Sequence, residues 1–178
     1  MKVAVLGGNG QLGTDVVAHL RQAGEEVAAL THADVELTDA SSVRAALRAA
    51  APEVVVGCAA WHHLGQCEED PQRAFAVNAA GALHVARAAR ELGAVVVYVS
   101  TDYVFDGAAA RPYTEGACPR PLSVYGASKL AGEHLTAAGC ERHYVVRVSG
   151  RRYVFAEPVR VVSIGEDALN VDFVAERR

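Results

Sequence analysis

Short β-branched runs alternate with longer Ala- and Leu-rich amphipathic segments along most of this chain, and this alternation restricts the possible folds most strongly. The apolar runs are nearly continuous, as in strands buried on both faces of a parallel sheet. They predict strands at 2–6, 26–30, 53–56, 94–100 and 143–148, and helices at 11–23, 40–50, 71–92 and 121–138. Because crossover connections are right-handed, the pattern indicates an α/β fold with a doubly wound parallel sheet in three α/β/α layers.

The domain organisation follows from where this pattern weakens. We expect one domain over residues 1–150, followed by a short extension over 151–178 in which 153–155 and 158–164 are candidate strands. The 178 residues suffice for one core without metal or disulfide support. We expect no leader peptide, because the chain opens directly into a strand.

Charge and cysteine usage exclude several classes of protein. The formal net charge is −4, whereas binding to nucleic acid or to a membrane surface favours a basic face. The sequence contains no run of 18 apolar residues, so we expect no transmembrane helix. The four cysteines form no Cys-x-x-Cys pair, and their spacing fits neither a zinc site nor a disulfide framework. We therefore expect a reduced cytoplasmic protein without a metal.

The first chemical motif is a glycine-rich turn between the first strand and the first helix, Gly7-Gly8-Asn9-Gly10-Gln11-Leu12-Gly13. Glycines permit the tight turn and let a pyrophosphate approach the backbone closely. The helix that starts there directs free N–H groups and its positive dipole end at the phosphates. The context of strand, turn and helix predicts a dinucleotide site, although a glycine turn that binds nothing is the alternative.

The second motif is Tyr125-Gly126-Ala127-Ser128-Lys129, on a predicted helix. Residues four apart share one helix face, so the phenol and the ammonium are expected to face the same pocket. An ammonium nearby would stabilise the phenolate and lower the tyrosine pKa towards neutrality. Lysine occurs only at positions 2 and 129, against fifteen arginines, which argues against Lys129 being an ordinary surface residue.

The third motif, Ser100-Thr101-Asp102-Tyr103-Val104-Phe105-Asp106-Gly107, ends the fourth predicted strand. Ligands of open α/β sheets bind at this edge, where Thr101 could hydrogen-bond a carbonyl oxygen that also faces Tyr125. Taken alone, the segment is better explained as a polar loop that caps a strand.

These motifs together resemble the dTDP-4-dehydrorhamnose reductases (RmlD-type) of the extended short-chain dehydrogenase/reductase superfamily. The resemblance covers residues 1 to about 150. It also rests on Ala59-Ala60-Trp61, Ala74-Phe75-Ala76-Val77-Asn78, Pro121-Leu122-Ser123-Val124, Leu130-Ala131-Gly132-Glu133 and Arg147-Val148-Ser149-Gly150.

The resemblance implies an NAD(P)-binding Rossmann domain and NAD(P)H-dependent reduction of a 4-keto nucleotide sugar, as in dTDP-rhamnose biosynthesis for cell-surface polysaccharide. Tyr125 would protonate the forming alkoxide, Lys129 would hold the ribose hydroxyls and tune Tyr125, and Thr101 would position the carbonyl. Asp102 and Tyr103 would face the substrate. The implied cofactor-binding residues are Gly7, Asn9, Gly10, Gln11, Leu12, Gly13, Glu36, Leu37, Ala59, Ala60, Trp61, Asn78, Ser100, Tyr125 and Lys129.

The sequence departs from the family pattern at three places. Gly57-Cys58 and Gly65 stand where the family has Asn-Ala and Asp, and His62-His63 replace smaller residues. Relatives are also longer, with a carboxyl-terminal region that grips the nucleotide sugar. We therefore expect weak sugar-nucleotide affinity, and self-association as a homodimer through apolar surface beside the crevice. The alternative is a non-catalytic dinucleotide-binding module that resembles the regulatory subunit of methionine adenosyltransferase.

The choice between NADP and NAD depends on the end of the second predicted strand. An NAD-specific site places a carboxylate there to hold the ribose 2′-hydroxyl. Here the strand ends in Leu30-Thr31-His32, with Asp34 following and no arginine near in sequence. Thr31 and His32 could accept either cofactor, and we favour NADP.

Overall fold

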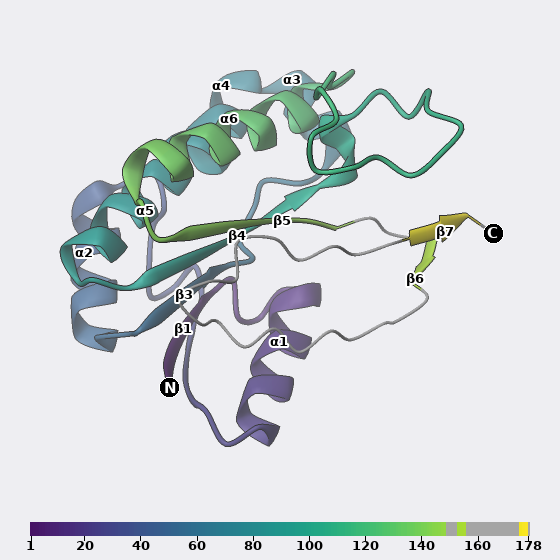
Figure 1. The fold of residues 1–178 in the computed structure, drawn as a ribbon. Coiled ribbons are helices and arrows are strands. Elements are labelled where there is room, and N and C mark those ends of the chain that lie inside the picture. Colours follow the sequence, from purple (N-terminus) through teal and green to yellow (C-terminus); the bar gives the residue numbers. More distant parts are fainter. Residues whose placement is uncertain (149–152, 156–174, 178) are drawn as a thin grey trace.

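The computed structural model describes residues 1–148, 153–155 and 175–177. Five parallel strands form one sheet in the order β2-β1-β3-β4-β5 (Figure 1). The strands are β1 (Lys2–Leu6), β2 (Glu26–Leu30), β3 (Val54–Gly57), β4 (Val95–Thr101) and β5 (His143–Val148). The strand order reverses direction between β1 and β3, and ligands of doubly wound sheets bind at such a switch point. The predicted doubly wound parallel sheet is confirmed.

The helices lie on both faces of this sheet (Figure 1). Helix α1 (Gln11–Gln22) covers one face, where Val17 packs on Val3 and Val5. Helices α2 (Ala40–Ala50), α5 (Gly81–Glu91) and α6 (Val124–Gly139) lie over the other face. Their core side chains include Leu47 and Val85, packed with strand residues such as Val55. Alternate residues of β1, β3 and β4 thus enter two separate apolar cores.

The segment predicted as one long helix over 71–92 is helical but divided. It comprises α4 (Pro71–Phe75), the π-helical turn η1 (Ala76–Ala80) and α5. A π-turn widens the helix by one residue and is frequent at functional sites. Here the widened turn contains Asn78, whose side chain is almost fully buried.

Two short elements were not predicted. Residues 64–69, interpreted as loop from the sequence, form helix α3 (Leu64–Glu69), and the 3₁₀ turn η2 (Asp102–Val104) follows β4. Both are too short to show a clear hydrophobic period. Helix α3 lies beside the start of α6, where the Glu68 carboxylate accepts a hydrogen bond from the Val124 N–H at 2.8 Å. The Ser123 hydroxyl caps α6 by accepting from Gly126 N–H.

The carboxyl-terminal segment is described only in part. The expected strand at 153–155 is confirmed as β6 (Tyr153–Phe155), which pairs antiparallel with β7 (Ala175–Arg177). The candidate strand at 158–164 lies outside the described residues, and the domain boundary near 150 stays a prediction.

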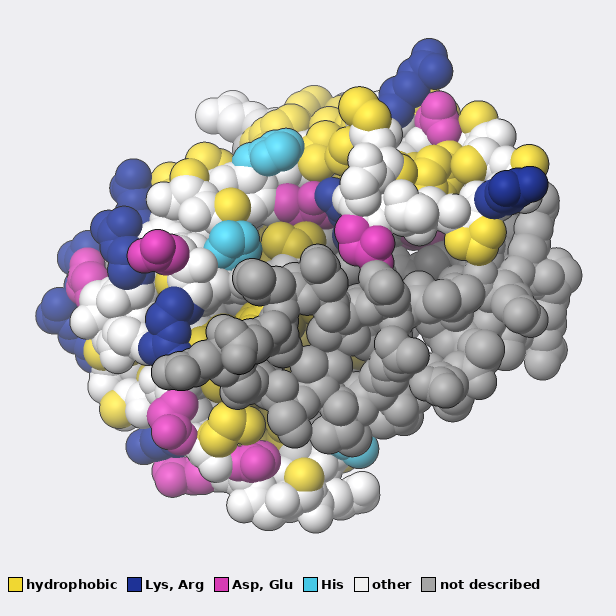
Figure 2. All heavy atoms as spheres, in the orientation of Figure 1, with side chains coloured by type: hydrophobic (Ala, Val, Ile, Leu, Met, Phe, Trp, Pro, Cys, Tyr) yellow, Lys and Arg dark blue, Asp and Glu magenta, His cyan; other side chains and the backbone are white. Residues whose placement is uncertain are grey.

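Charged side chains of both signs intermix around α2 and the end of α5 (Figure 2). On this surface the Glu91 carboxylate pairs with Arg44 and Arg48, each at 3.2 Å. Within the described ranges, no helix is long and apolar enough to cross a membrane.

Candidate active site

The glycine-rich turn joins the carboxyl end of β1 to the start of α1. Gly7 adopts φ +76°, a left-handed conformation that favours glycine. The N–H groups of Gly7 and Gly8 donate to Leu30 O at 2.8 and 3.1 Å, which ties the turn to the end of β2. Helix α1 then begins after Gly10 without a side-chain cap. The turn therefore offers an open helix N-terminus to a ligand at the sheet's carboxyl edge.

Gly7, Gly8 and Gly13 have no room for a side chain, and a Cβ on Gly8 would lie 2.9 Å from Ala29 Cβ. A Cβ on Gly7 would lie 2.8 Å from Ala59 N, so the turn packs directly on the segment after β3. A Cβ on Gly13 would collide with the carbonyl oxygen of Gly7. The neighbouring segments thus pack directly against the turn, and its shape depends on these three glycines.

We expect Gly13→Ala to lower the free energy of unfolding by at least about 2 kcal/mol, because backbone must move to admit the methyl group. Urea unfolding followed by circular dichroism would measure the loss. Gly65→Ala is the matched control, since a Cβ there meets nothing within 4 Å. The control should stay within about 1 kcal/mol of wild type, as helix propensity favours alanine. Equal stability of both variants would contradict the tight packing of this turn.

Asn78 holds the segment Ala59-Ala60-Trp61 in place. Its side-chain oxygen accepts from Trp61 N–H at 2.8 Å, and its amide nitrogen donates to Trp61 O and to Ser128 Oγ, each at 2.9 Å. Both hydrogens of the side-chain amide are therefore donated to other groups of the protein. Asn78 therefore acts as a buried support that joins the end of β3 to α6, and its direct contact with a cofactor stays a prediction.

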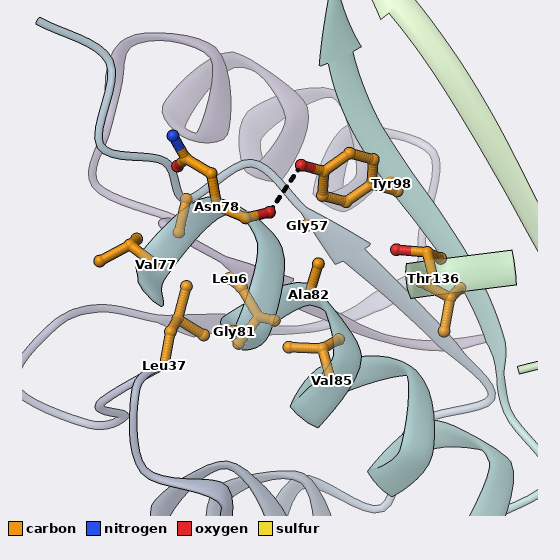
Figure 3. Close-up of a pocket in the computed structure, with 12 residues that line it drawn as sticks. Leu6, Leu37, Gly57, Val77, Asn78, Gly81, Ala82, Val85, Tyr98 and Thr136 are labelled. Carbon is orange, nitrogen blue, oxygen red and sulfur yellow. Dashed lines mark hydrogen bonds between the residues drawn. The ribbon is translucent and has the colours of Figure 1, made fainter. Parts of the chain in front are cut away.

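Glu36 and Leu37, expected near an adenine, lie between β2 and α2. The Glu36 carboxylate accepts from Thr38 N–H and Thr38 Oγ1, which lower its pKa. The Leu37 side chain lines a small apolar cavity, shown in Figure 3 with Val77 and Gly81 beside it. The cavity has room for about one water molecule, so it is too small to hold a dinucleotide.

Thr101 and Tyr125 come together at the carboxyl end of β4. The Thr101 side chain interacts with the Tyr125 phenol. The Thr101 hydroxyl donates to Asp102 Oδ1 at 3.2 Å. The rings of Tyr103 and Tyr125 meet edge to face, with centroids 5.8 Å apart. The expected acid, its positioning hydroxyl and both predicted substrate-facing residues therefore form one cluster.

The tyrosine pKa differs from expectation. Burial raises the pKa of Tyr125 above its usual value, and the hydrogen bond from Thr101 offsets this only in part. Lys129 was expected to lower this pKa, but its Nζ atom is directed at another group. The prediction of a depressed phenol pKa is therefore wrong for this state of the protein, and Tyr125 keeps its proton at neutral pH.

Lys129 is almost fully buried, with 2% of its surface exposed. Its Nζ atom donates to Val99 O at 2.7 Å and lies 4.0 Å from the centre of the Tyr98 ring. Burial lowers the pKa of this ammonium from 10.5 to about 7, and the charge of Glu133 opposes the decrease. An ammonium group has three hydrogen-bond donors, and the bond to Val99 O uses one of them. The others could donate to hydroxyl groups of a ligand.

Glu133, Arg147 and Tyr98 also belong to the site, although the sequence assigned them no role. The Ser100 hydroxyl, expected to face a cofactor, instead donates to Glu133 Oε1 at 2.6 Å. Arg147 forms a bidentate pair with the same carboxylate, at 2.9 and 2.6 Å. The Tyr98 hydroxyl donates to Asn78 O. The spacing of four between Lys129 and Glu133 could have placed them on one helix face, but the partners on β4 and β5 could not be derived from spacing.

The end of β2 offers no free carboxylate for a ribose. Asp34 Oδ2 accepts from Thr31 N–H and Thr31 Oγ1 at 2.8 and 2.7 Å, so the carboxylate closes its own turn. The His32 side chain is exposed. Thr31 and His32 directly follow the end of β2, as the sequence indicated, and they are the residues there that could contact the ribose.

The predicted residues thus occupy one edge of the sheet. The glycine turn, Ala59 and the cluster around Thr101 all follow the carboxyl ends of parallel strands. Within residues 1–148 and the two short described strands, no three His, Cys, Asp or Glu side chains gather as a metal site.

Comparison of the sequence with protein families matches residues 1–160 to the RmlD substrate binding domain. A dTDP-4-keto-6-deoxy-D-glucose reductase of Streptomyces niveus is 44% identical over 129 residues, which cover 72% of this chain and 45% of the relative. The chain spans about half the length of the curated relatives it matches.

Solved structures show the same similarity. The dTDP-4-dehydrorhamnose reductase of Bacillus anthracis, in complex with NADP, has a TM-score of 0.80 and 35% identity, covering 84% of this chain and 54% of that chain. The UDP-glucose 4-epimerase of Thermus thermophilus, in complex with NAD, has a TM-score of 0.72 and 32% identity over the same shares.

Proposed function

The chain belongs to the family of the RmlD substrate binding domain, and from this premise we propose that it binds NADP or NAD and reduces a 4-keto nucleotide sugar. The observation that carries the proposal is the interaction of Tyr125 with Thr101 at the carboxyl end of β4, where Lys129 of the same helix donates to Val99 O, two residues before Thr101. The names of the relatives, which are reductases of dTDP-4-keto sugars, agree with it. The proposal includes a cytoplasmic homodimer that binds neither nucleic acid nor a membrane.

The residues present suit a nicotinamide dinucleotide. The turn at Gly7–Gly13 contains four glycines, which let a pyrophosphate approach the backbone closely, and the uncapped start of α1 favours negative charge. Lys129 retains ammonium hydrogens for ribose hydroxyls. Ala59 and Ala60, which follow β3, have small side chains that a cofactor could approach closely. A bound nicotinamide dinucleotide would supply the hydride.

Tyr125 is the proton donor in this proposal. Its raised pKa keeps the phenol protonated at neutral pH, which suits protonation of an alkoxide oxygen as a carbonyl is reduced. The Thr101 hydroxyl, which interacts with Tyr125, would turn its hydrogen from Asp102 to the same carbonyl oxygen and orient it. When Lys129 is protonated, its charge would stabilise the phenolate left on Tyr125.

Asp102 and Tyr103 would contact the sugar. Both belong to the 3₁₀ turn η2 directly after Thr101. Tyr103 is exposed and its ring touches that of Tyr125, so a sugar bound over Tyr125 would also meet Tyr103.

Titration of the chain with NADPH, followed by nicotinamide fluorescence, tests cofactor binding. We expect NADPH to bind more tightly than NADH, because the end of β2 carries Thr31 and His32 and the Asp34 carboxylate is engaged with Thr31. An affinity for NADH more than about tenfold above that for NADPH would contradict this preference.

A turnover assay with a dTDP-4-keto-6-deoxy sugar then separates the enzyme from the binding module. Oxidation of NADPH that depends on the sugar nucleotide supports a reductase. Tight NADPH binding without any turnover would instead support the non-catalytic module.

A further inference from the structure

Glu133 is a buried carboxylate at the centre of the polar contacts between α6, β4 and β5. It is 6% exposed and accepts hydrogen bonds from Ser100 Oγ and from both Nε and a terminal nitrogen of Arg147. Charge-assisted bonds of this kind are strong and directional. One carboxylate on α6 therefore holds residues from two neighbouring strands.

Lys129 lies one helical turn before Glu133 and contacts the same part of β4. Its Nζ atom donates to Val99 O, the carbonyl directly before Ser100. The end of β4 is thus attached to α6 at two adjacent residues, once through Lys129 and once through Glu133. Thr101, which bonds to Tyr125, is the next residue of this strand.

Arg147 extends the contact network to the loop after β4. Its guanidinium lies 5.1 Å from the centre of the Phe105 ring, which stacks on Tyr113 with centroids 4.1 Å apart. The Tyr113 hydroxyl donates to Asp106 at 2.7 Å. The loop that follows the substrate-facing residues is therefore fixed against the Glu133–Arg147 pair.

We propose that Glu133 is a positioning residue, which fastens the ends of β4 and β5 to α6 and so fixes Lys129 where the cofactor's ribose binds. This inference rests on the proposed function, because it assigns Lys129 to the cofactor. Glu133 contacts Ser100 and Arg147 and acts on the site through them.

The charge of Glu133 also acts on Lys129. The charged and titratable groups around the ammonium are Glu133 on α6, Tyr98 on β4 and Cys58 after β3. Burial raises the pKa of the Cys58 thiol to about 11 and raises that of the Tyr98 phenol further, so both stay neutral near pH 7. Glu133 is therefore the anion that keeps Lys129 protonated, and neutralising it lowers the lysine pKa.

The test is the affinity for NADPH of wild type and Glu133→Gln between pH 6.5 and 9, measured by fluorescence on the full 178-residue chain. Over this range the cofactor phosphates stay mainly ionised. Wild-type affinity should fall as pH rises through about 7, the pKa of Lys129. In Glu133→Gln this fall should shift to lower pH, leaving NADPH binding about tenfold weaker at pH 8.

The matched control is Glu91→Gln, which also removes a carboxylate paired with arginine, here Arg44 and Arg48, but one that lies on the surface by α2. It should bind NADPH as wild type does at every pH. A purely structural role of Glu133 would lower the folded fraction without moving the pH at which affinity falls. Wild-type affinity and pH dependence in Glu133→Gln would overturn the inference, whereas no NADPH binding by wild type would contradict the proposed function itself.

Glu133→Asp keeps the test decisive should the glutamine variant not fold. Aspartate retains the negative charge, but its side chain is one methylene shorter, so the carboxylate lies farther from Ser100 and Arg147. We expect the wild-type pH dependence with an affinity about threefold weaker throughout, because charge remains while geometry is lost. Binding at wild-type strength would show that the contacts of Glu133 do not position Lys129.

Discussion

Tyr125→Phe is expected to lower the rate of keto-sugar reduction by at least about a hundredfold, because it removes the proton that the reaction needs at the carbonyl oxygen. The affinity for NADPH should stay within about twofold of wild type. The phenylalanine ring still fills the same space and still meets the ring of Tyr103. Rates of NADPH oxidation at saturating sugar nucleotide, together with a fluorescence titration, measure both effects.

Tyr113→Phe is a suitable control for this experiment. It removes a phenol that bonds to Asp106 in the loop rather than to Thr101. We expect it to keep most of the activity. If Tyr125→Phe retained most of the wild-type rate, the proton would come from another group and the assignment of Tyr125 would be wrong.

Lys129→Met is expected to make stability less dependent on pH, with the stability gap between the two proteins changing by about 4 kcal/mol between pH 7 and pH 10. The folded protein holds Lys129 with a pKa of about 7, against 10.5 in water. Between these values the unfolded chain binds a proton that the folded chain does not. This difference in proton binding stabilises wild type as pH rises, and methionine removes it.

Methionine should therefore be the more stable side chain near pH 7, where wild type bears the cost of burying a cation, and the advantage should disappear towards pH 10. Urea unfolding of both proteins at several pH values measures the difference in their free energies of unfolding. Cys58 and Tyr98 are present in both proteins, so their titration cancels to first order in this difference. NADPH binding should be lost in Lys129→Met. Parallel stability curves for the two proteins would show that Lys129 is not buried as a cation.

The order of elements along the chain could be predicted from the sequence because it depends on local patterns. The Val-rich runs predicted all five strands of the sheet, and Gly24 and Gly93 follow helices where positive φ is required. The division of the segment over 71–92 was missed, since a π-helical turn changes the hydrophobic period by only one residue. Helix α3 was missed because six residues make fewer than two turns.

The sequence by itself determined the fold class, the glycine turn and the pairing of Tyr125 with Thr101 at one sheet edge. Each follows from a rule of short range: glycine tolerates the turn, and strands of a parallel sheet present their carboxyl ends together. The tertiary structure alone decided the partners of the charged groups. Lys129 reaches Val99 across 30 residues, and Glu133 reaches Ser100 across 33. Such contacts depend on the distance between α6 and β4, which core packing sets and no local pattern encodes.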